Sequence, residues 1–307
     1  MGVAPHTVRD RLEAARLYYD LVPIETPAHE TPAVPVFEVL TKPRVIVRAS
    51  STARPEGDAT RLVILGDAHQ SPGMSVDRWK WFARHVAAVN PDRVCQIGDL
   101  GEFASLSGHE RPGSVQQKAK PKFQDDLACV EEALAAYRAE LGPTKIPHHV
   151  TLGNHDERIW RHESTVAEVE GSLVPQFTDI LGRYDWRWTE YRQYVFIGGV
   201  AFTHVPMTLM ERPFNGRTLN PIVNDLTMSL VFGHTHRHSF LNCPKIGPAQ
   251  RIEVLNVGTA APHGWFPDYA TSEQGGLSWG ICEATVQAGH IVRHEFIDML
   301  TLERRYA

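Results

Sequence analysis

The stretch "RLVILGDAH" (Arg61–His69) opens a series of short apolar runs, each of which ends in a glycine or a polar cluster. The runs that follow are "RVCQIGDL", "HHVTLGNHD", "YVFIGGVAFTH", "SLVFGHTH" and "IEVLNVGTA". Their β-branched residues and near-continuous hydrophobicity are typical of strands that are buried on both faces. We therefore expect each run to form a buried strand.

Helices are predicted between the early runs. Apolar residues recur at helical spacing over residues 76–90 ("VDRWKWFARHVAAVN") and 123–141 ("FQDDLACVEEALAAYRAEL"). This strand–helix–strand order predicts a layered α/β fold whose ligands gather at the carboxyl ends of the strands. Near the C-terminus, "SWGICEATVQAGHIVRHEFID" predicts an antiparallel hairpin with "QAGH" as its turn.

The first 60 residues have a different character. Apolar residues recur at helical spacing from Thr7 to Leu21, and Thr7 is a suitable N-cap. The proline-rich stretch "VPIETPAHETPAVPVF" then predicts an extended linker, and "RVIVRAS" (Arg44–Ser50) predicts an isolated strand. We expect an N-terminal helix with a proline-rich extension over residues 1–60 and a larger domain over residues 61–307.

The overall composition limits the classes of partner. A net charge of −5 gives no general attraction for polyanions, so contact with nucleic acid would need a local basic patch. The four cysteines are scattered without a CxxC spacing, which is typical of reduced thiols in a cytosolic protein. The chain has neither a run of eighteen apolar residues nor a secretion leader, and we expect a cytoplasmic protein without a membrane partner.

Potential metal ligands stand at the ends of five predicted strands. They are Asp67 and His69, Asp99, Asn154 with His155 and Asp156, His204, and His234 with His236. Two divalent cations about 3.5–4 Å apart need a bridging carboxylate and several nitrogen and oxygen donors on rigid supports. Strand ends supply that rigidity, and glycines 66, 98, 153 and 233 are expected to permit the turns that aim the ligands.

The blocks "GDAH", "GDLGE", "GNHD", "TH" and "GHTH", in this order from Gly66 to His236, resemble the five signature blocks of the calcineurin-like metallophosphoesterase family. The resemblance implies a four-layer α/β/β/α sandwich, in which two mixed β-sheets are flanked by helices, and makes residues 61–307 the catalytic domain. Two positions depart from the family pattern without removing a ligand. Glu102 stands where aspartate is usual, and Thr203 stands where glycine is common.

The resemblance also implies a role for each residue. Asp67, His69 and His236 would hold a first metal, Asp99 would bridge, and Asn154, His204 and His234 would hold a second. His155 would protonate the leaving oxygen or stabilise the transition state, and Asp156 would orient the His155 ring. His238, the third histidine of "HTHRH", is expected to bind neither metal.

The implied activity is hydrolysis of a P–O bond by a metal-bridging hydroxide. We expect a phosphodiesterase acting on nucleic acid or nucleotides, similar to enzymes of bacteria and bacteriophages, in the cytoplasm of a bacterial or phage-infected cell. A phosphomonoesterase, a cyclic nucleotide phosphodiesterase and a non-catalytic binding module of the same fold are the alternatives. The donor set, which lacks thiolates, predicts two divalent ions, manganese first and iron, zinc, nickel or cobalt as alternatives.

Four residues are candidates for substrate binding. His109 and Arg111 lie in a basic loop after the bridging aspartate, and Arg158 and His162 follow "GNHD". A solvated polar loop is the alternative interpretation for the first two. The stretch "DWRWTEY" (Asp185–Tyr191) alternates aromatic and charged residues, and we expect it to cover a sheet edge rather than to stack bases.

Overall fold

The computed structural model describes residues 21–23, 37–39, 58–108, 113–216, 218–247, 250–266 and 275–307. The chain divides into two units, Met1–Arg48 and Ala49–Ala307. In the first unit, β1 (Leu21–Pro23) pairs antiparallel with β2 (Phe37–Val39). The helix predicted from Thr7, except for Leu21, and the strand predicted at residues 44–50 lie outside the described residues. The predicted division at residue 60 therefore stays a prediction.

The second unit contains a six-stranded mixed sheet in the order β13-β12-β3-β4-β5-β6. The four strands β3 to β6 are parallel, and β12 and β13 extend the sheet in antiparallel fashion. The bounds are β3 Thr60–Leu65, β4 Arg93–Gln96, β5 His148–Thr151, β6 Trp186–Thr189, β12 Gly280–Gln287 and β13 His290–Asp298. The predicted C-terminal hairpin is confirmed, and its turn uses Ala288 and Gly289, both at positive φ (49° and 81°).

A second mixed sheet has five strands in the order β10-β11-β9-β8-β7. Within it, β9 runs parallel to both β8 and β11, while the two edge pairs are antiparallel. The bounds are β7 Val195–Ile197, β8 Val200–Phe202, β9 Leu230–Phe232, β10 His238–Pro244 and β11 Arg251–Val257.

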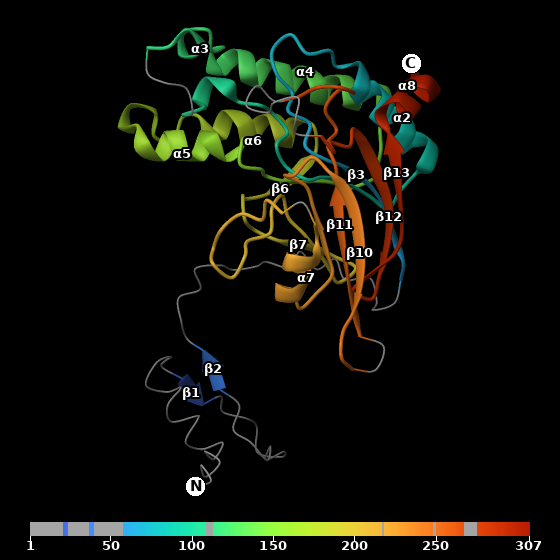
Figure 1. The fold of residues 1–307 in the computed structure, drawn as a ribbon. Coiled ribbons are helices and arrows are strands. Elements are labelled where there is room, and N and C mark those ends of the chain that lie inside the picture. The colour runs from blue at the N-terminus through green and yellow to red at the C-terminus, as the bar shows by residue number, and fades with distance from the viewer. Residues whose placement is uncertain are drawn as a thin grey trace. The chain divides into compact units, whose positions relative to one another are not determined.

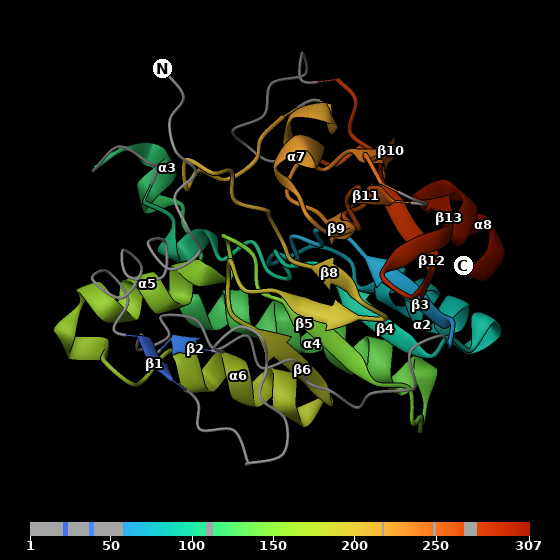
Figure 2. The same cartoon turned by 90° about the horizontal axis from the view of Figure 1, so that it is seen from below.

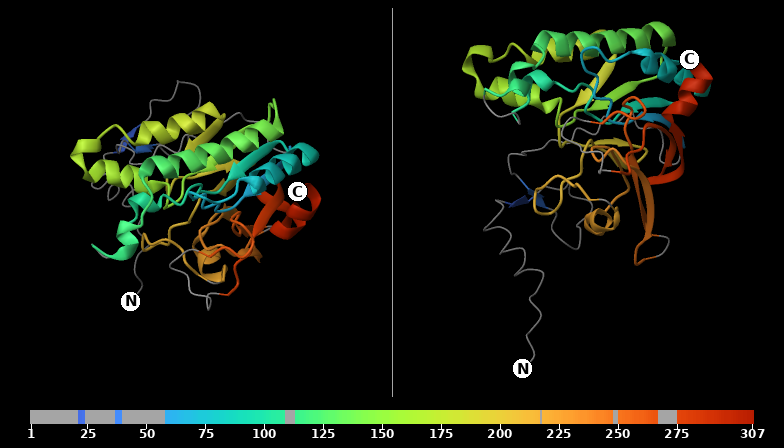
Figure 3. Two further views of the ribbon diagram at one scale, coloured as in Figure 1. Left: turned by 90° about the horizontal axis from the view of Figure 1, so that it is seen from above. Right: turned by 45° about the horizontal axis from the view of Figure 1, so that its top comes forward.

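Helices cover the outer faces of both sheets. The longer ones, α2, α4, α5 and α6, lie over the six-stranded sheet (Figures 1 and 3), and α7 lies beside the five-stranded sheet (Figure 2). The bounds are α2 Asp77–Val89, α3 Val115–Lys118, α4 Phe123–Leu141, α5 Glu157–Thr165, α6 Val174–Arg183, α7 Asn220–Asp225 and α8 Met299–Tyr306, with 3₁₀ turns η1 Ala104–Leu106 and η2 Ala167–Val169. None of the described helices is long and apolar enough to cross a membrane.

Three apolar clusters hold these layers together. Strand β3 shows the principle, because Val63 and Leu65 pack under the helices while Leu62 and Ile64 face the second sheet. A third cluster joins the outer face of the five-stranded sheet to α7, through residues such as Phe232 and Ile222. Because a strand covered on both faces alternates between two cores, every position of its run is apolar. The predicted four-layer α/β/β/α sandwich is confirmed.

The crossing between the two sheets leaves no space for a side chain at Gly66. A Cβ atom at this position would collide with the carbonyl oxygen of Gly258, which follows β11. We predict that Gly66→Ala lowers the free energy of unfolding by about 1–3 kcal/mol, because a rigid backbone has to move. The control is Gly182→Ala in α6, where a Cβ meets nothing within 4 Å. It should be neutral or stabilising by about 0.5–1 kcal/mol. Urea unfolding of the full chain measures both, and equal stabilities would contradict the proposed crowding.

Candidate metal centre

The predicted ligands all follow strands whose carboxyl ends meet. Asp67 and His69 come after β3, Asp99 after β4 and Asn154 after β5, and these three strands are parallel neighbours. The other ligands follow β8 and β9, which are parallel neighbours in the second sheet. Parallel strands end at the same edge of a sheet, so the fold brings ligands from both sheets to one place.

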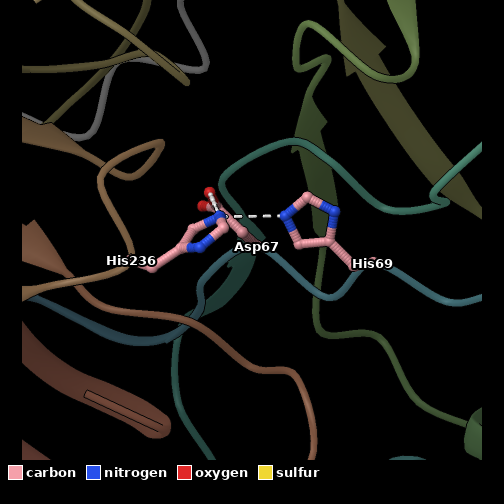
Figure 4. Close-up of side chains that lie close together, drawn as sticks. All are labelled: Asp67, His69 and His236. Carbon is pink, nitrogen blue, oxygen red and sulfur yellow. Dashed lines mark hydrogen bonds and ion pairs between the residues drawn. The ribbon is translucent and has the colours of Figure 1, made fainter. Parts of the chain in front are cut away.

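Asp67, His69 and His236 form the first cluster. One ligand atom from each lies within 4.8 Å of the others. Figure 4 shows the three side chains pointing toward one another, with His236 Nε2 2.9 Å from His69 Nε2 and 3.1 Å from Asp67 Oδ2. All three residues are buried.

Asp99, His204 and His234 form a second cluster of the same size. His204 Nε2 lies 3.4 Å from Asp99 Oδ2, 3.2 Å from His234 Nδ1 and 3.0 Å from Asn154 Oδ1. The same Asp99 oxygen lies 3.8 Å from His69 Nε2 in the first cluster. One carboxylate therefore reaches both sets of donors.

The backbone turns sharply at the ligands themselves. His69, Asp99, His234 and His236 have positive φ angles of 45°, 49°, 67° and 56°. Non-glycine residues rarely adopt this region, although Asp and His adopt it more often than most. With these backbone angles, the turns after β3, β4 and β9 place the four side chains in the clusters.

Three of the four preceding glycines serve another purpose than the one predicted. Among the four, Gly98 alone has a positive φ (81°), as a tight turn requires. Gly66 makes room for the Gly258 carbonyl oxygen. At Gly153 a Cβ would collide with the Asp99 carboxylate, and at Gly233 with Asp67 Oδ1. Glycine at these two positions makes room for a carboxylate that belongs to a different strand.

The donor set fits divalent cations. Two pairs of imidazole nitrogens face each other across 2.9 Å and 3.2 Å, and each pair needs a proton or a cation between its lone pairs. Buried Asp67 Oδ2 accepts no hydrogen bond of good geometry from the described residues, although it lies 3.1 Å from His236 Nε2. Buried carboxylates and imidazoles without thiolates are suited to divalent transition metals. The arrangement is that of a divalent metal centre.

Partners at the far side of the rings hold three imidazoles in place. His204 Nδ1 donates to Ile97 O at 2.7 Å, and His69 Nδ1 lies 2.7 Å from Glu102 Oε2. His234 Nε2 lies 2.7 Å from Asn215 Oδ1. Such partners fix the orientation of a ligating ring. Asn215 was not found from the sequence, because it lies in a polar loop with no strand beside it.

His155 lies next to both clusters, and its ring has a different partner from the one predicted. The His155 backbone N–H donates to Asp99 Oδ1 at 2.8 Å, and ring Nδ1 lies 3.1 Å from Glu102 Oε1. The Asp156 side chain turns away and accepts backbone N–H groups of Gly153, Leu100 and Gly101 at 2.8, 3.1 and 3.3 Å. The expectation that Asp156 orients the His155 ring is therefore wrong, because these three donors already occupy the carboxylate. Glu102 holds that ring.

Burial and neighbouring charges shift the pKa values of several groups at this centre. Burial opposes ionisation of Asp99, but His204, His155 and His69 outweigh it and hold the Asp99 pKa well below its usual range. Burial, with help from His204, lowers the pKa of His234 to about 4. Burial also disfavours a charged His155 ring, but Asp99 and Glu102 outweigh this effect and raise its pKa to about 9. Neutral imidazoles and ionised carboxylates are the forms that bind metal.

Of the four residues predicted to bind substrate, Arg158 lies beside the metal centre. His109 and Arg111 lie outside the described residues. Arg158 is buried beside the site, where Nη1 donates to Glu102 O at 2.7 Å and Nη2 lies 3.5 Å from His155 Nε2. His162 is half-buried in the last turn of α5, outside the clusters. His238 lies on β10 with its ring stacked on Phe296 at 4.6 Å, and it too lies outside the clusters.

Comparison with known proteins was made for sequence and for structure. A family model described as calcineurin-like phosphoesterase matches residues 60–238. No curated protein matches the chain by sequence. Similar solved structures include the phosphoesterase Yfce from E. coli, with 18% identity over 78% of this chain and 100% of that one and a TM-score of 0.32. They also include a metallophosphoesterase from Sphaerobacter thermophilus, with 13% identity over 80% and 93% of the two chains and a TM-score of 0.35.

The family match covers more than half of the chain and includes all five blocks from "GDAH" to "GHTH". These blocks supply the buried clusters of aspartate and histidine described above. The chain therefore belongs to the calcineurin-like phosphoesterase family of metal-dependent phosphoester hydrolases.

Proposed function

We propose that this hydrolase is a dinuclear phosphodiesterase. The observation that supports two ions rather than one is the Asp99 carboxylate, whose Oδ2 lies 3.8 Å from His69 and 3.4 Å from His204. A bridging carboxylate between two sets of neutral donors is what a pair of dications requires. Two ions, when bound, neutralise the charge of the phosphoryl group and make water a nucleophile near neutral pH.

Each side chain has a proposed role in holding these ions. Asp67, His69 and His236 hold the first, Asn154, His204 and His234 hold the second, and Asp99 is shared. We propose manganese as the metal, because all the donors are oxygen or nitrogen atoms. Iron, zinc, nickel and cobalt bind the same kinds of donor and are the alternatives. A cytoplasmic location in a bacterial or phage-infected cell is part of the proposal. The four free cysteines support the cytoplasm, which keeps thiols reduced.

His155 is the proposed proton donor. In the hydrolysis, water gives one proton to the solvent, its oxygen joins phosphorus, the bond from phosphorus to the leaving oxygen breaks, and the leaving oxygen takes a proton from His155. Glu102 occupies His155 Nδ1, so we propose the other ring nitrogen, Nε2, as the atom that protonates the leaving oxygen. We also propose that Arg158, whose Nη2 lies 3.5 Å from this Nε2, contacts the same substrate oxygens.

A diester is preferred because a poor leaving group needs protonation at the moment when its bond breaks. His155 lies beside the shared Asp99 carboxylate, where it is placed to supply that proton. A phosphomonoesterase or a cyclic nucleotide phosphodiesterase would use the same centre on another substrate, and a binding module would show no turnover. Rates of the manganese-loaded chain on bis-p-nitrophenyl phosphate, p-nitrophenyl phosphate and a cyclic nucleotide decide among them. Faster turnover of the monoester or of the cyclic nucleotide would overturn the proposal.

The shared carboxylate predicts that Asp99→Asn loses both metal and activity. The variant keeps the shape of the side chain but removes the charge that both sets of donors share. We expect the metal content, measured by mass spectrometry after dialysis, to fall well below two ions per chain, and hydrolysis of bis-p-nitrophenyl phosphate to be abolished. His238→Gln is the control, because this ring lies outside the clusters, and it should keep both metal and activity. Two retained ions in Asp99→Asn would contradict the bridging role.

His155→Ala should separate catalysis from metal binding. The variant keeps all seven proposed ligands and removes the proton donor, so we expect full metal content with kcat lowered by about 10²–10⁴-fold on a dinucleoside phosphate, whose alkoxide leaving group needs that proton. Chromatographic analysis of the products at saturating metal measures kcat. An unchanged kcat, or a loss of metal equal to that of Asp99→Asn, would show that His155 has another role.

The partners of Glu102 and Asp156 predict different effects for two isosteric variants. Glu102→Gln removes the charge between the His69 and His155 rings, and we expect metal affinity or kcat to fall by about 10–100-fold with little change in stability. Asp156→Asn replaces an acceptor of three backbone N–H groups and should mainly lower the free energy of unfolding. Urea unfolding and kinetics of both variants test the distinction, which fails if their effects are interchanged.

A further inference from the structure

An indole ring stacks on one of the ligand imidazoles. Trp265 lies in the loop after β11, with its ring centroid 4.9 Å from that of His69 and an angle of 26° between the planes. Its centroid is 6.4 Å from that of His236. Trp279 Nε1 donates to Trp265 O at 2.9 Å and fixes the loop. Trp265 is half-buried, and its ring lies beside the first cluster.

A second aromatic ring lies beside the second cluster. Tyr191, in the turn after β6, has its ring centroid 6.2 Å from that of His204 and is half-buried. The exposed Arg192 places its guanidinium over the Tyr191 ring, 5.1 Å from the centroid. His69 and His204 both face Asp99 Oδ2, so an aromatic ring accompanies each set of donors around the shared carboxylate.

The predicted sheet-edge function of "DWRWTEY" therefore applies to only part of this stretch. Trp186 is buried in the core, and Trp188 packs against Trp160 with 5.7 Å between ring centroids. Tyr191 is different, because its ring contacts lie at the metal centre. Of these three rings, the Tyr191 ring is the one that contacts a proposed ligand.

We propose, on the basis of the phosphodiesterase activity proposed above, that Trp265 is the stacking surface for a nucleobase and that the substrate is a nucleoside phosphodiester. Tyr191 and Arg192 contact the other ester arm. A phosphodiester has two ester groups, one on each side of its phosphorus atom. With the phosphate at the metal centre, one ester group lies near Trp265 and the other near Tyr191 and Arg192. Stacking of a base on an aromatic side chain changes binding by roughly 5–150-fold per base and tolerates any base sequence.

The charge of the chain favours this mode of recognition over phosphate tracking. With a net charge of −5, affinity for a polyanion cannot come from the whole surface, whereas stacking needs no net positive charge. A base must leave its duplex neighbours before it can stack on a protein ring. We therefore assign a single-stranded nucleic acid, or its end, as the natural form of this nucleoside phosphodiester.

The test compares two diesters with the same leaving group. Thymidine 5′-(p-nitrophenyl phosphate) carries a base, and methyl p-nitrophenyl phosphate does not. We expect the manganese-loaded wild-type chain to prefer the thymidine ester at least 10-fold in kcat/KM. Trp265→Ala should reduce this ratio to below about 3, and Trp265→Phe should restore most of it, because phenyl rings also stack. Ile246→Ala, at a fully exposed position between β10 and β11, is the control and should keep the wild-type ratio.

A merely supporting role of Trp265 for His69 gives a different result. In that case Trp265→Ala lowers metal content and lowers both rates together, so the ratio between the two esters stays as in the wild type. That outcome, or a wild-type ratio near one, overturns the base-stacking proposal while leaving the phosphodiesterase proposal intact.

If the wild-type chain hydrolyses neither ester, that result counts against the phosphodiesterase proposal alone. Binding measurements then test the base-stacking proposal. Calorimetric titration should then show thymidine 5′-monophosphate binding at least 10-fold more tightly than 2-deoxyribose 5-phosphate, with the difference lost in Trp265→Ala. Equal affinities would overturn base stacking. Stronger competition by a single-stranded oligothymidylate than by a duplex supports nucleic acid as the source of the nucleoside, and the reverse order overturns the single-stranded assignment.

Discussion

The position of the Asp99 carboxylate is the constraint on which the rest of the centre depends. Its Oδ1 accepts the backbone N–H of His155 at 2.8 Å, and its Oδ2 faces imidazoles from both sheets at 3.8 and 3.4 Å. To place it there, the chain accepts a positive φ at Asp99 and a glycine at position 153, where any Cβ would collide with the carboxylate. This one side chain therefore constrains the backbone after β4 and the residue type after β5.

Burial makes this arrangement unfavourable without a cation. Asp67 and Asp99 are both completely or almost completely buried. The negative charge of Asp99 acts on Asp67, so two carboxylates repel each other inside the protein. Paired imidazole nitrogens contribute more unsatisfied lone pairs, and four ligands have strained backbone angles. Rigid strands on both sides, packed in three apolar clusters, hold the donors in this geometry. The free energy that folding provides offsets the cost of buried charge, unsatisfied lone pairs and backbone strain. A divalent cation then binds strongly, because the donors are already in place.

The sequence predicted the elements whose pattern is strong and missed those whose pattern is weak. The expected helix at 123–141 matches α4, and the one at 76–90 matches α2 to within one residue at each end. Helix α5 was not predicted, because its polar stretch buries only Arg158 and Ile159. All seven proposed ligands were named because they follow buried strands. The partners in loops, Asn215 and Trp265, have no such neighbour in sequence, and only the folded chain brings them to the rings they contact.

Glu102 shows why a role cannot always be assigned from adjacency in the sequence. Asp156 follows His155 directly, yet its side chain binds backbone groups of the loops after β4 and β5. Glu102, in the loop after β4, is the residue whose side chain contacts the His155 ring. The same carboxylate holds His69 through Oε2 and His155 through Oε1, and Arg158 anchors the Glu102 carbonyl. A glutamate has one more methylene than aspartate with which to span both rings. One side chain therefore supports both a proposed ligand and the proposed proton donor, so a change at Glu102 affects metal binding and proton transfer together.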